Sequence, residues 1–392
     1  MNGMKMNCMK RRTFLSVSAS AAVLGPAFIL NHVQAGADPL RAAVIGHTGR
    51  GDYGHGLESI FNGRPGIVVV GLADPDPDGR SRAAAKAGAL RTYADWRQML
   101  EREKPNLVSL AMRHADQHFE IGRDVLRAGA HLYCEKPFTR TPAEADELLE
   151  EAARRNLKIA VAHTYRLQQN IVRLKQALEE GFLGELVEMR AYGKQDARAG
   201  GEDMMVLGSH LFDLFRMFAG DPLWCTARVL AGDRDITRSD ARLVKDNVGL
   251  VAGDRVFAHF AFKNGVNATF SSAAALRETT AGWGIELHCA KGVARIHIDL
   301  EPVVFVRKST AWQASGRTDT WHPLSATVLK GAEPRVTNPV TDWLDAIAEN
   351  REPVCSGKDG AWAIEMVMGV YQAALTEKRV WFPLTVRTHP LA

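Results

Sequence analysis

A glycine-rich loop near the start of the chain could hold the phosphates of a nucleotide. It reads Gly46, His47, Thr48, Gly49, Arg50 and Gly51, and it follows a short apolar run. A dinucleotide loop needs residues without bulk at the turn and free N–H groups at a helix start, where the helix dipole favours phosphate. Read as G-x-G-x-x-G, the pattern keeps Gly46 and Gly51 but has Thr48 in the middle. The Thr48 hydroxyl and the Arg50 guanidinium could both donate to phosphate, and Gly49 keeps the loop flexible.

A carboxylate follows at the end of the next apolar run. Asp74 lies 28 residues after Gly46, where it could accept hydrogen bonds from ribose hydroxyls. An acid there repels a 2'-phosphate, so NAD is the expected cofactor, with NADP possible because Arg80 lies nearby. The alternative is a glycine-rich turn followed by an aspartate that caps a helix.

Several motifs occur together in one order along the chain. After the glycine loop and Asp74 come Glu135-Lys136-Pro137, the segment 208–213 (Gly-Ser-His-Leu-Phe-Asp) and the segment 357–365, which starts Gly-Lys-Asp-Gly-Ala-Trp. In this order the chain resembles the Gfo/Idh/MocA oxidoreductase family, from Leu40 to its C terminus. The resemblance implies a Rossmann domain followed by an α/β domain with a large open sheet. It also implies NAD(P)-dependent oxidation or reduction of a sugar or cyclitol carbon.

The resemblance also assigns roles to site residues. Lys136 would point at the reacting hydroxyl, where an ammonium can stabilise an alkoxide or relay a proton, and it would also lie against the cofactor beside Glu135. His210 matches the family's histidine and would be the general base, unless it is a capping or core histidine. The aspartate that many members carry four residues earlier is Val206 here. We expect Asp213 or Asp203 to supply the missing carboxylate.

Other polar residues follow the ends of predicted strands. The resemblance places cofactor contacts after the third strand and nicotinamide-side contacts after the fifth. A polar loop between residues 194 and 203 suits a polyhydroxylated or acidic substrate, although a solvated surface loop is the alternative. The resulting candidates are Arg113 and His118 for the cofactor, and His163, Tyr165, Arg166, Lys194 and Asp203 for the substrate.

Alternating apolar runs and helical stretches must position these residues. The predicted strands of the first half span 41–46, 66–73, 106–111, 130–134 and 157–162, and the predicted helices span 53–61, 80–87, 95–103, 117–128 and 142–155. Continuous apolar strands alternating with helices indicate a doubly wound parallel sheet, which binds ligands at the carboxyl ends of its strands.

The pattern of predicted strands and helices changes after Tyr165. Runs of adjacent short strands between residues 187 and 306 predict a mainly antiparallel or mixed sheet, followed by two closing helices, 340–349 and 361–377. The expected fold class is therefore α/β, with a Rossmann domain at 38–164 and an α/β substrate and oligomerisation domain at 165–392. The strand-rich part offers a face for a homo-oligomer.

The basic charge of the chain belongs to its first residues. The formal net charge of +4 equals the four basic residues of positions 1–37, which contain no acid, so the remaining 355 residues carry no net formal charge. The charge therefore gives no indication of a nucleic-acid partner. Lys10-Arg11-Arg12 before Thr-Phe-Leu, a mildly apolar stretch and Ala35-Gly36-Ala37 are typical of a twin-arginine export signal. We expect export to the periplasm or outside the cell, with no stable membrane insertion after the signal is removed.

The side-chain inventory gives no convincing metal site, because the histidines and cysteines show no ligand spacing. Cys134, Cys225, Cys289 and Cys355 are expected to be buried thiols rather than disulfides. The main functional hypothesis is an exported NAD(P)-dependent oxidoreductase that acts on a carbohydrate or cyclitol and holds its cofactor tightly. The alternatives are a glycosidase that uses NAD transiently and a sugar-binding protein without activity.

Overall fold

The computed structural model describes residues 38–276, 283–298, 303–308, 320–325 and 337–392. The predicted export signal at 1–37 lies outside this part of the chain. Within the described residues, no helix has the length and apolar character needed to cross a membrane.

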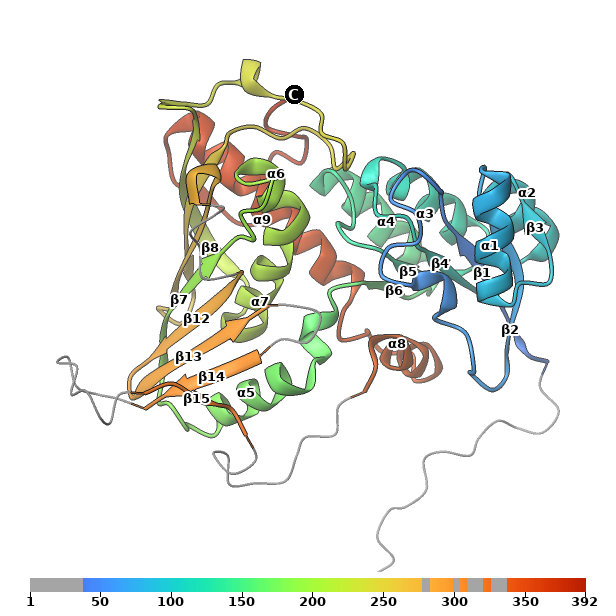
Figure 1. The fold of residues 1–392 in the computed structure, drawn as a ribbon, viewed down its shortest axis with the longest axis horizontal. Coiled ribbons are helices and arrows are strands. Elements are labelled where there is room, and N and C mark those ends of the chain that lie inside the picture. Colours follow the sequence, from blue (N-terminus) through green and yellow to red (C-terminus); the bar gives the residue numbers. More distant parts are fainter. Residues whose placement is uncertain (1–37, 277–282, 299–302, 309–319, 326–336) are drawn as a thin grey trace, which may run out of the picture. The chain divides into compact units, whose positions relative to one another are not determined.

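The first half forms a parallel sheet of six strands in the order β3-β2-β1-β4-β5-β6 (Figure 1). The core strands are apolar and buried on both faces, as a sheet with helices on both sides requires. Asp76, Asp95 and Thr141 cap helices α1, α2 and α4 through hydrogen bonds to main-chain N–H groups. The strands are β1 (Leu40–Ile45), β2 (Ile67–Ala73), β3 (Thr92–Tyr93), β4 (Leu107–Leu110), β5 (His131–Cys134) and β6 (Ile159–Val161). The helices are α1 (Pro77–Ala87), α2 (Trp96–Glu103), α3 (His118–Arg127) and α4 (Pro142–Arg154).

The first crossover differs from the prediction. In place of a helix over 53–61 the chain makes successive turns and one short 3-10 helix, η1 (Leu57–Ser59). The cause is local, because Gly51, Asp52, Gly54 and Gly56 all have positive φ. A right-handed helix cannot form through repeated left-handed residues. The loop therefore ends without the helix N-terminus that the phosphate-binding argument assumed.

The second half forms a ten-stranded sheet in the order β15-β14-β13-β12-β7-β11-β10-β8-β16, with β9 paired to β8. Only β7 and β11 pair in parallel, so the sheet is mixed and mainly antiparallel. Both predicted sheets are thus confirmed. The strands are β7 (Leu186–Tyr192), β8 (Pro222–Ala231), β9 (Arg234–Asp235), β10 (Arg255–Phe262), β11 (Asn267–Ala273), β12 (Gly284–Cys289), β13 (Gly292–His297), β14 (Val303–Arg307), β15 (His322–Pro323) and β16 (Val380–Trp381).

Helices cover one face of this sheet (Figure 1). They are α5 (Gln169–Glu179), the short α6 (Gly201–Asp203), α7 (Ser209–Ala219) and α9 (Gly357–Thr376), with short 3-10 helices at Thr164–Leu167, Arg238–Asp240 and Ala274–Leu276. Phe212 of α7 packs edge-on against Phe260 and Phe270, each with a ring-centroid distance of 5.1 Å. Residues 204–208, between α6 and α7, form a π-helical turn.

The last helices return to the first sheet. Trp343 of α8 (Pro339–Ala348) is fully buried against Tyr133 of β5, with ring centroids 5.6 Å apart. The Val161 amide of β6 donates to the Cys355 carbonyl at 2.8 Å. The core of the Rossmann domain therefore includes residues far beyond the predicted boundary at 164.

Candidate active site

The glycine loop lies against the segment that follows β4. A Cβ atom on Gly51 would come within 2.7 Å of the Arg113 amide nitrogen, and the φ of Gly51 is +83°. The Arg113 Nε donates to the Gly51 carbonyl at 3.2 Å. Only glycine combines this conformation with this close approach. Arg113 thus supports the loop as well as lying beside the predicted cofactor site.

Asp74 lies under the loop rather than at its surface. It has no exposed area, and its Oδ2 accepts hydrogen bonds from the Thr48 amide (3.0 Å), the Thr48 hydroxyl (2.7 Å) and the Tyr53 hydroxyl (2.7 Å). Its Oδ1 accepts from the Asp76 amide at 2.9 Å. These donors occupy the carboxylate, so the expected contact of Asp74 with ribose hydroxyls does not fit this geometry. The Thr48 hydroxyl, expected to donate to phosphate, donates to Asp74 instead.

A cavity of about 260 Å³ opens at the carboxyl ends of the first strands. It lies where the strand order reverses between β1 and β4, which is where doubly wound sheets bind nucleotides. Arg50, at one end of the loop, forms an ion pair with Asp116. The lining includes Gly46, His47, Pro75, Trp96, Met112 and Gln117. An apolar and aromatic hollow beside a glycine loop fits the adenosine part of a dinucleotide.

His118 is not in contact with this cavity. Its side chain is fully buried, its Nε2 lies 2.8 Å from the Met112 carbonyl and its Nδ1 lies 2.9 Å from the Pro137 carbonyl. Both ring nitrogens thus lie against main-chain carbonyls, which gives His118 a structural position, and its predicted cofactor contact stays a prediction. The residue instead joins the loop after β4 to the Lys136-Pro137 turn.

Glu135 connects the glycine loop to Lys136, the predicted catalytic lysine. It is fully buried, and its Oε1 lies 3.3 Å from Nδ1 of His55. A Cβ atom on Gly54 would come within 2.9 Å of Glu135 Oε2, so the loop passes directly over this carboxylate. The expected role of Glu135 in holding the cofactor site together is consistent with these contacts.

Lys136 reaches from the Rossmann domain into the second half of the chain. It is 6% exposed, and its Nζ donates to the Val206 carbonyl at 3.3 Å. Burial lowers the pKa of the Lys136 ammonium. Val206 belongs to the π-helical turn, and its side chain is buried in the apolar core. At the position where the family aspartate is missing, the main chain therefore supplies an oxygen to the lysine.

His210 stands in a cluster of aromatic rings at the start of α7. Its ring centroid lies 4.9 Å from that of Tyr165, 5.4 Å from that of His163 and 6.0 Å from that of Trp283. Its Nδ1 is buried without a hydrogen-bond partner. Burial, followed by the positive charge of Lys136, lowers the pKa of His210 well below its usual value. A neutral imidazole beside a lysine can accept a proton at neutral pH.

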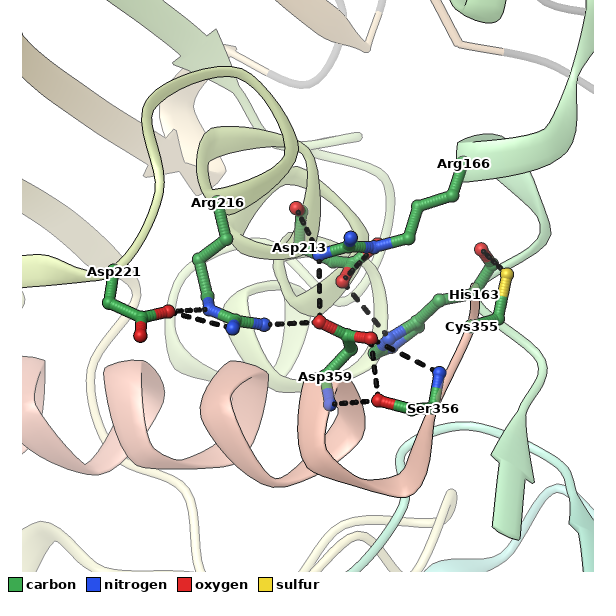
Figure 2. Close-up of polar contacts among 8 residues, drawn as sticks. All are labelled: His163, Arg166, Asp213, Arg216, Asp221, Cys355, Ser356 and Asp359. Carbon is green, nitrogen blue, oxygen red and sulfur yellow. Dashed lines mark hydrogen bonds and ion pairs between the residues drawn. The ribbon is translucent and has the colours of Figure 1, made fainter. Parts of the chain in front are cut away.

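Asp213 is not free to act as the base. Its two carboxylate oxygens share the single N–H of Arg166 Nε, each at 2.8 Å, and Arg166 also lies 3.1 Å from Asp359 (Figure 2). Arg216 contacts the same Asp359 oxygen at 2.7 Å, and Ser356 caps the helix through Asp359. Asp213 and Arg166 thus belong to a buried ion network at the start of α9, and their predicted roles in catalysis and substrate binding stay predictions.

Asp203 has a structural position as well. Its carboxylate accepts from the Ser272 hydroxyl at 2.6 Å and the Gln195 amide at 3.0 Å, and burial raises its pKa. It holds the polar loop onto β11, and its predicted roles in substrate binding and in the relay to His210 stay predictions. Lys194 is exposed on the same loop, and its substrate role stays a prediction.

Three contributors to the site were not predicted from the sequence. They are His55, Trp283 and the Val206 carbonyl. His55 lies four positions beyond Gly51, in a run of glycines, which was the only available signal. Nothing in the local sequence around Trp283 or Val206 indicates their place beside the lysine.

The chain matches known proteins over both halves of this structure. Residues 40–163 match the oxidoreductase family with an NAD-binding Rossmann fold named GFO_IDH_MocA, and residues 171–295 match the GFO/IDH/MocA C-terminal domain. The chain belongs to the Gfo/Idh/MocA oxidoreductase family. It is accordingly an NAD(P)-dependent oxidoreductase with NAD as its cofactor.

Individual Gfo/Idh/MocA relatives are distant. D-apiose dehydrogenase of Paraburkholderia graminis is 25% identical over 327 residues, which cover 79% of this chain and 81% of that protein. Myo-inositol 2-dehydrogenase of Thermotoga maritima is 21% identical, covering 80% and 90%. A levoglucosan dehydrogenase solved with NADH and levoglucosan superposes with a TM-score of 0.69 at 20% identity, covering 88% of this chain and all of that one. An aldose-aldose oxidoreductase from Caulobacter crescentus solved with glycerol gives 0.68 at 17% identity, with the same coverage.

Proposed function

We propose that this Gfo/Idh/MocA protein is an exported oxidoreductase that oxidises or reduces a ring carbon of a sugar, glycoside or cyclitol. The single observation that carries the proposal is the placement of Lys136 beside a neutral His210, next to a nucleotide-binding Rossmann sheet. Relatives named for their substrates include dehydrogenases of D-apiose, levoglucosan, myo-inositol and D-glucosides, which are all polyhydroxylated compounds.

NAD, when bound, accepts or supplies the hydride at the reacting carbon. Gly46, Gly51 and the cavity at the strand ends would hold it, and Glu135 would fix the loop above it. Lys136 stabilises the charge that develops on the substrate oxygen, because its ammonium is held in a nearly dry site. His210 takes the hydroxyl proton during oxidation and returns it during reduction.

The test uses two preparations, the full chain and the chain without residues 1–37. Each preparation is incubated with D-apiose, levoglucosan, myo-inositol and simple glycosides in the presence of NAD+ or NADP+, and absorbance at 340 nm is recorded. Activity with NAD+ on at least one polyol supports the proposal. An aryl glycoside that releases its aryl group without net NADH would favour the glycosidase alternative. No binding of either nucleotide, together with binding of sugars, would favour the sugar-binding alternative.

Export and tight cofactor binding form one connected part of the proposal. The twin-arginine pattern of residues 10–15 suits a route that carries folded proteins. An enzyme outside the cytoplasm has little free NAD, so it has to keep its cofactor and regenerate it with a second substrate. Fractionation of cells that express the full chain, followed by release of nucleotide from the native protein, tests both. Protein retained in the cytoplasm contradicts export, and protein free of nucleotide contradicts tight binding.

We also propose that the face of the ten-stranded sheet without helices binds a second copy of the chain. Tyr192, Phe257 and Trp381 are exposed, on β7, β10 and β16 of this sheet. Large apolar side chains on a two-layer domain are typical of subunit interfaces. Light scattering of the wild type and of the variant Phe257→Lys measures the outcome, and a monomeric wild type would contradict it.

A further inference from the structure

His163 is the buried group nearest to His210 that the proposed reaction leaves unexplained. It is 1% exposed, and neither of its ring nitrogens has a hydrogen-bond partner. Its ring makes an edge contact with the ring of His210, with centroids 5.4 Å apart. A buried polar side chain without partners is costly, so an unpaired histidine pair beside Lys136 calls for a function.

The far side of His163 faces a carboxylate. Its Nδ1 lies 3.8 Å from Asp213 Oδ1, and Asp213 is held in place by Arg166 and through it by Asp359 (Figure 2). The ring of His163 therefore lies close both to His210 and to a fixed negative charge. The main chain adds support, because the His163 carbonyl accepts from the Cys355 thiol at 3.3 Å.

The residue at position 206 explains why His210 needs a connection to a carboxylate. A histidine base becomes positively charged when it takes a proton, and a carboxylate next to it normally stabilises that charge. In this chain the position four residues before His210 is Val206. Its side chain is apolar, and its carbonyl accepts a hydrogen bond from Lys136. The buried Nδ1 of His210 has no hydrogen-bond partner, whereas His163 lies close to both His210 and Asp213.

We propose that His163 is a positioning residue that connects His210 to Asp213 and replaces the missing aspartate. When His210 takes the hydroxyl proton, its Nδ1–H donates to the unprotonated nitrogen of His163, and Nδ1–H of His163 donates to Asp213. The proton stays on His210, and His163 stays neutral throughout. The inference rests on the proposed function only in naming the substrate hydroxyl as the source of the proton.

Two effects of His163 on His210 have opposite signs and can be separated. The charged groups that face this pair are Lys136, His55, Arg166, Asp213 and Asp359. If His163 were only a cationic neighbour, its removal would raise the pKa of His210. If it accepts a hydrogen bond from the protonated ring, its removal lowers that pKa, because the charged form loses its partner.

The experiment is a titration of the full protein labelled with 15N in histidine, followed by NMR from pH 4 to pH 9 without substrate. His163→Phe keeps the ring and removes both nitrogens, and we expect the pKa of His210 to fall. His163→Asn keeps an acceptor oxygen, and we expect a smaller fall. His131→Gln is the matched control, because His131 lies at the start of β5, at the opposite end of that strand from Lys136. It should leave the pKa of His210 unchanged. A raised or unchanged pKa of His210 in both His163 variants would overturn the inference.

A second measurement tests whether His163 replaces the aspartate that is missing at position 206. In the His163→Phe background, Val206→Asp restores the carboxylate that family members carry, and the pKa of His210 should rise again. With an active substrate, His163→Phe should lower kcat by about tenfold or more with little change in KM, and the double variant should recover part of it. Absence of rescue in a folded double variant contradicts the replacement. Because the titration needs no substrate, a failure to find a substrate counts against the proposed function alone.

Discussion

Within the described residues, no carboxylate forms a salt bridge with the Lys136 ammonium. Its Nζ contacts a main-chain carbonyl, and the buried Glu135 and the more distant Asp246 provide the negative potential around it. The charge is therefore available to a substrate oxygen, which is where an oxidoreductase of alcohols needs it.

Lys136→Met removes that charge and keeps the length of the side chain. We expect kcat to fall by about 100-fold or more, because the developing alkoxide loses its cation. Thermal stability should stay the same or rise, since a buried ammonium is costly to hold. Lys263→Met, in the exposed turn between β10 and β11, is the control and should retain full kcat. Equal activity of the two variants would remove Lys136 from the chemistry.

The pH dependence follows from two lowered pKa values. Burial holds the pKa of His210 well below 6.5, so the base is already free at neutral pH and loses its function only as pH falls further. Burial also lowers the pKa of Lys136 below 10.5, so the ammonium is lost earlier on the alkaline side. The oxidation rate should be bell-shaped, with its acid limb below pH 6.5 and its alkaline limb below pH 10.5. An acid limb above pH 7 would contradict the assignment of His210.

The roles of individual residues were the least predictable part of the site. The positions of Lys136 and His210 followed from motifs, since Lys136 comes shortly after β5 and His210 lies in the first turn of α7. Four other polar residues were also selected from the sequence, but their hydrogen-bond and ion-pair partners come from other elements. These residues are Asp74, His118, Asp203 and Asp213. Which donor reaches a buried carboxylate depends on the packing of loops, and local sequence carries no signal for that.

The glycine loop is the element that the structure changes most. The sequence correctly predicts a tight turn after β1, but repeated left-handed residues replace the expected helix. The loop is instead fixed by side chains below it, with Asp74 and Glu135 as its supports.

Gly51→Ala tests this close packing. The new Cβ atom would lie 2.7 Å from the Arg113 amide, so the loop must move away from the segment after β4, and NAD binding should weaken. The matched control is Gly63→Ala, which has a similar positive φ and open space around its Cβ position. Both variants should lose about 1–2 kcal/mol of stability from the left-handed backbone, but only Gly51→Ala should lose NAD affinity. Calorimetric titration with NAD and thermal unfolding separate the two effects.

The start of α9 joins the ion network of Figure 2 to the site. Burial alone would raise the pKa of Asp359, but Arg166, the Ser356 hydroxyl and Arg216 lower it below 3.8. A depressed pKa means that this carboxylate stabilises the fold above about pH 3.8 and that the stabilisation is lost as pH falls through the lower folded value.

Asp359→Asn should cost about 3 kcal/mol of stability at pH 7, because two guanidinium groups lose their buried partner. The difference from the wild type should shrink below pH 4, where Asp359 itself takes a proton. Chemical denaturation at pH 7 and pH 3.5 measures both values. A difference that does not depend on pH would show that packing, not charge, accounts for the loss.

Most of the secondary structure of the whole chain could be predicted. The apolar runs of the parallel sheet were identified because both faces of each strand are buried. In the second half the sequence predicts strands at 187–192, 255–262, 266–271, 284–289, 294–298 and 303–306. It does not predict β8, since burial does not alternate along Pro222–Ala231 and the strand lacks the period of a half-buried strand. The two-residue strands β3 and β15 are too short to leave a pattern.

The two halves of the molecule share their stability through α8. Trp343 is fully buried against Phe61 and Tyr133 of the Rossmann domain, although it lies almost 180 residues beyond the predicted boundary. Trp343→Ala should lower the free energy of unfolding by about 3–5 kcal/mol. Trp381→Ala, on a side chain that is 60% exposed, is the control and should have little effect. Calorimetry should show one shifted transition for Trp343→Ala, and loss of only a minor, separate transition would contradict shared stability.

The packing of Trp343 and Cys355 on the first sheet also sets the timing of maturation. A ribosome releases the chain from its N terminus, so the glycine loop and Lys136 leave the exit tunnel long before the tryptophan that completes their domain. The nucleotide-binding half can reach its final core only when synthesis is nearly finished. We therefore expect NAD to be captured late in synthesis or after it, and a folded-export route would have to wait for that step before the protein leaves the cytoplasm.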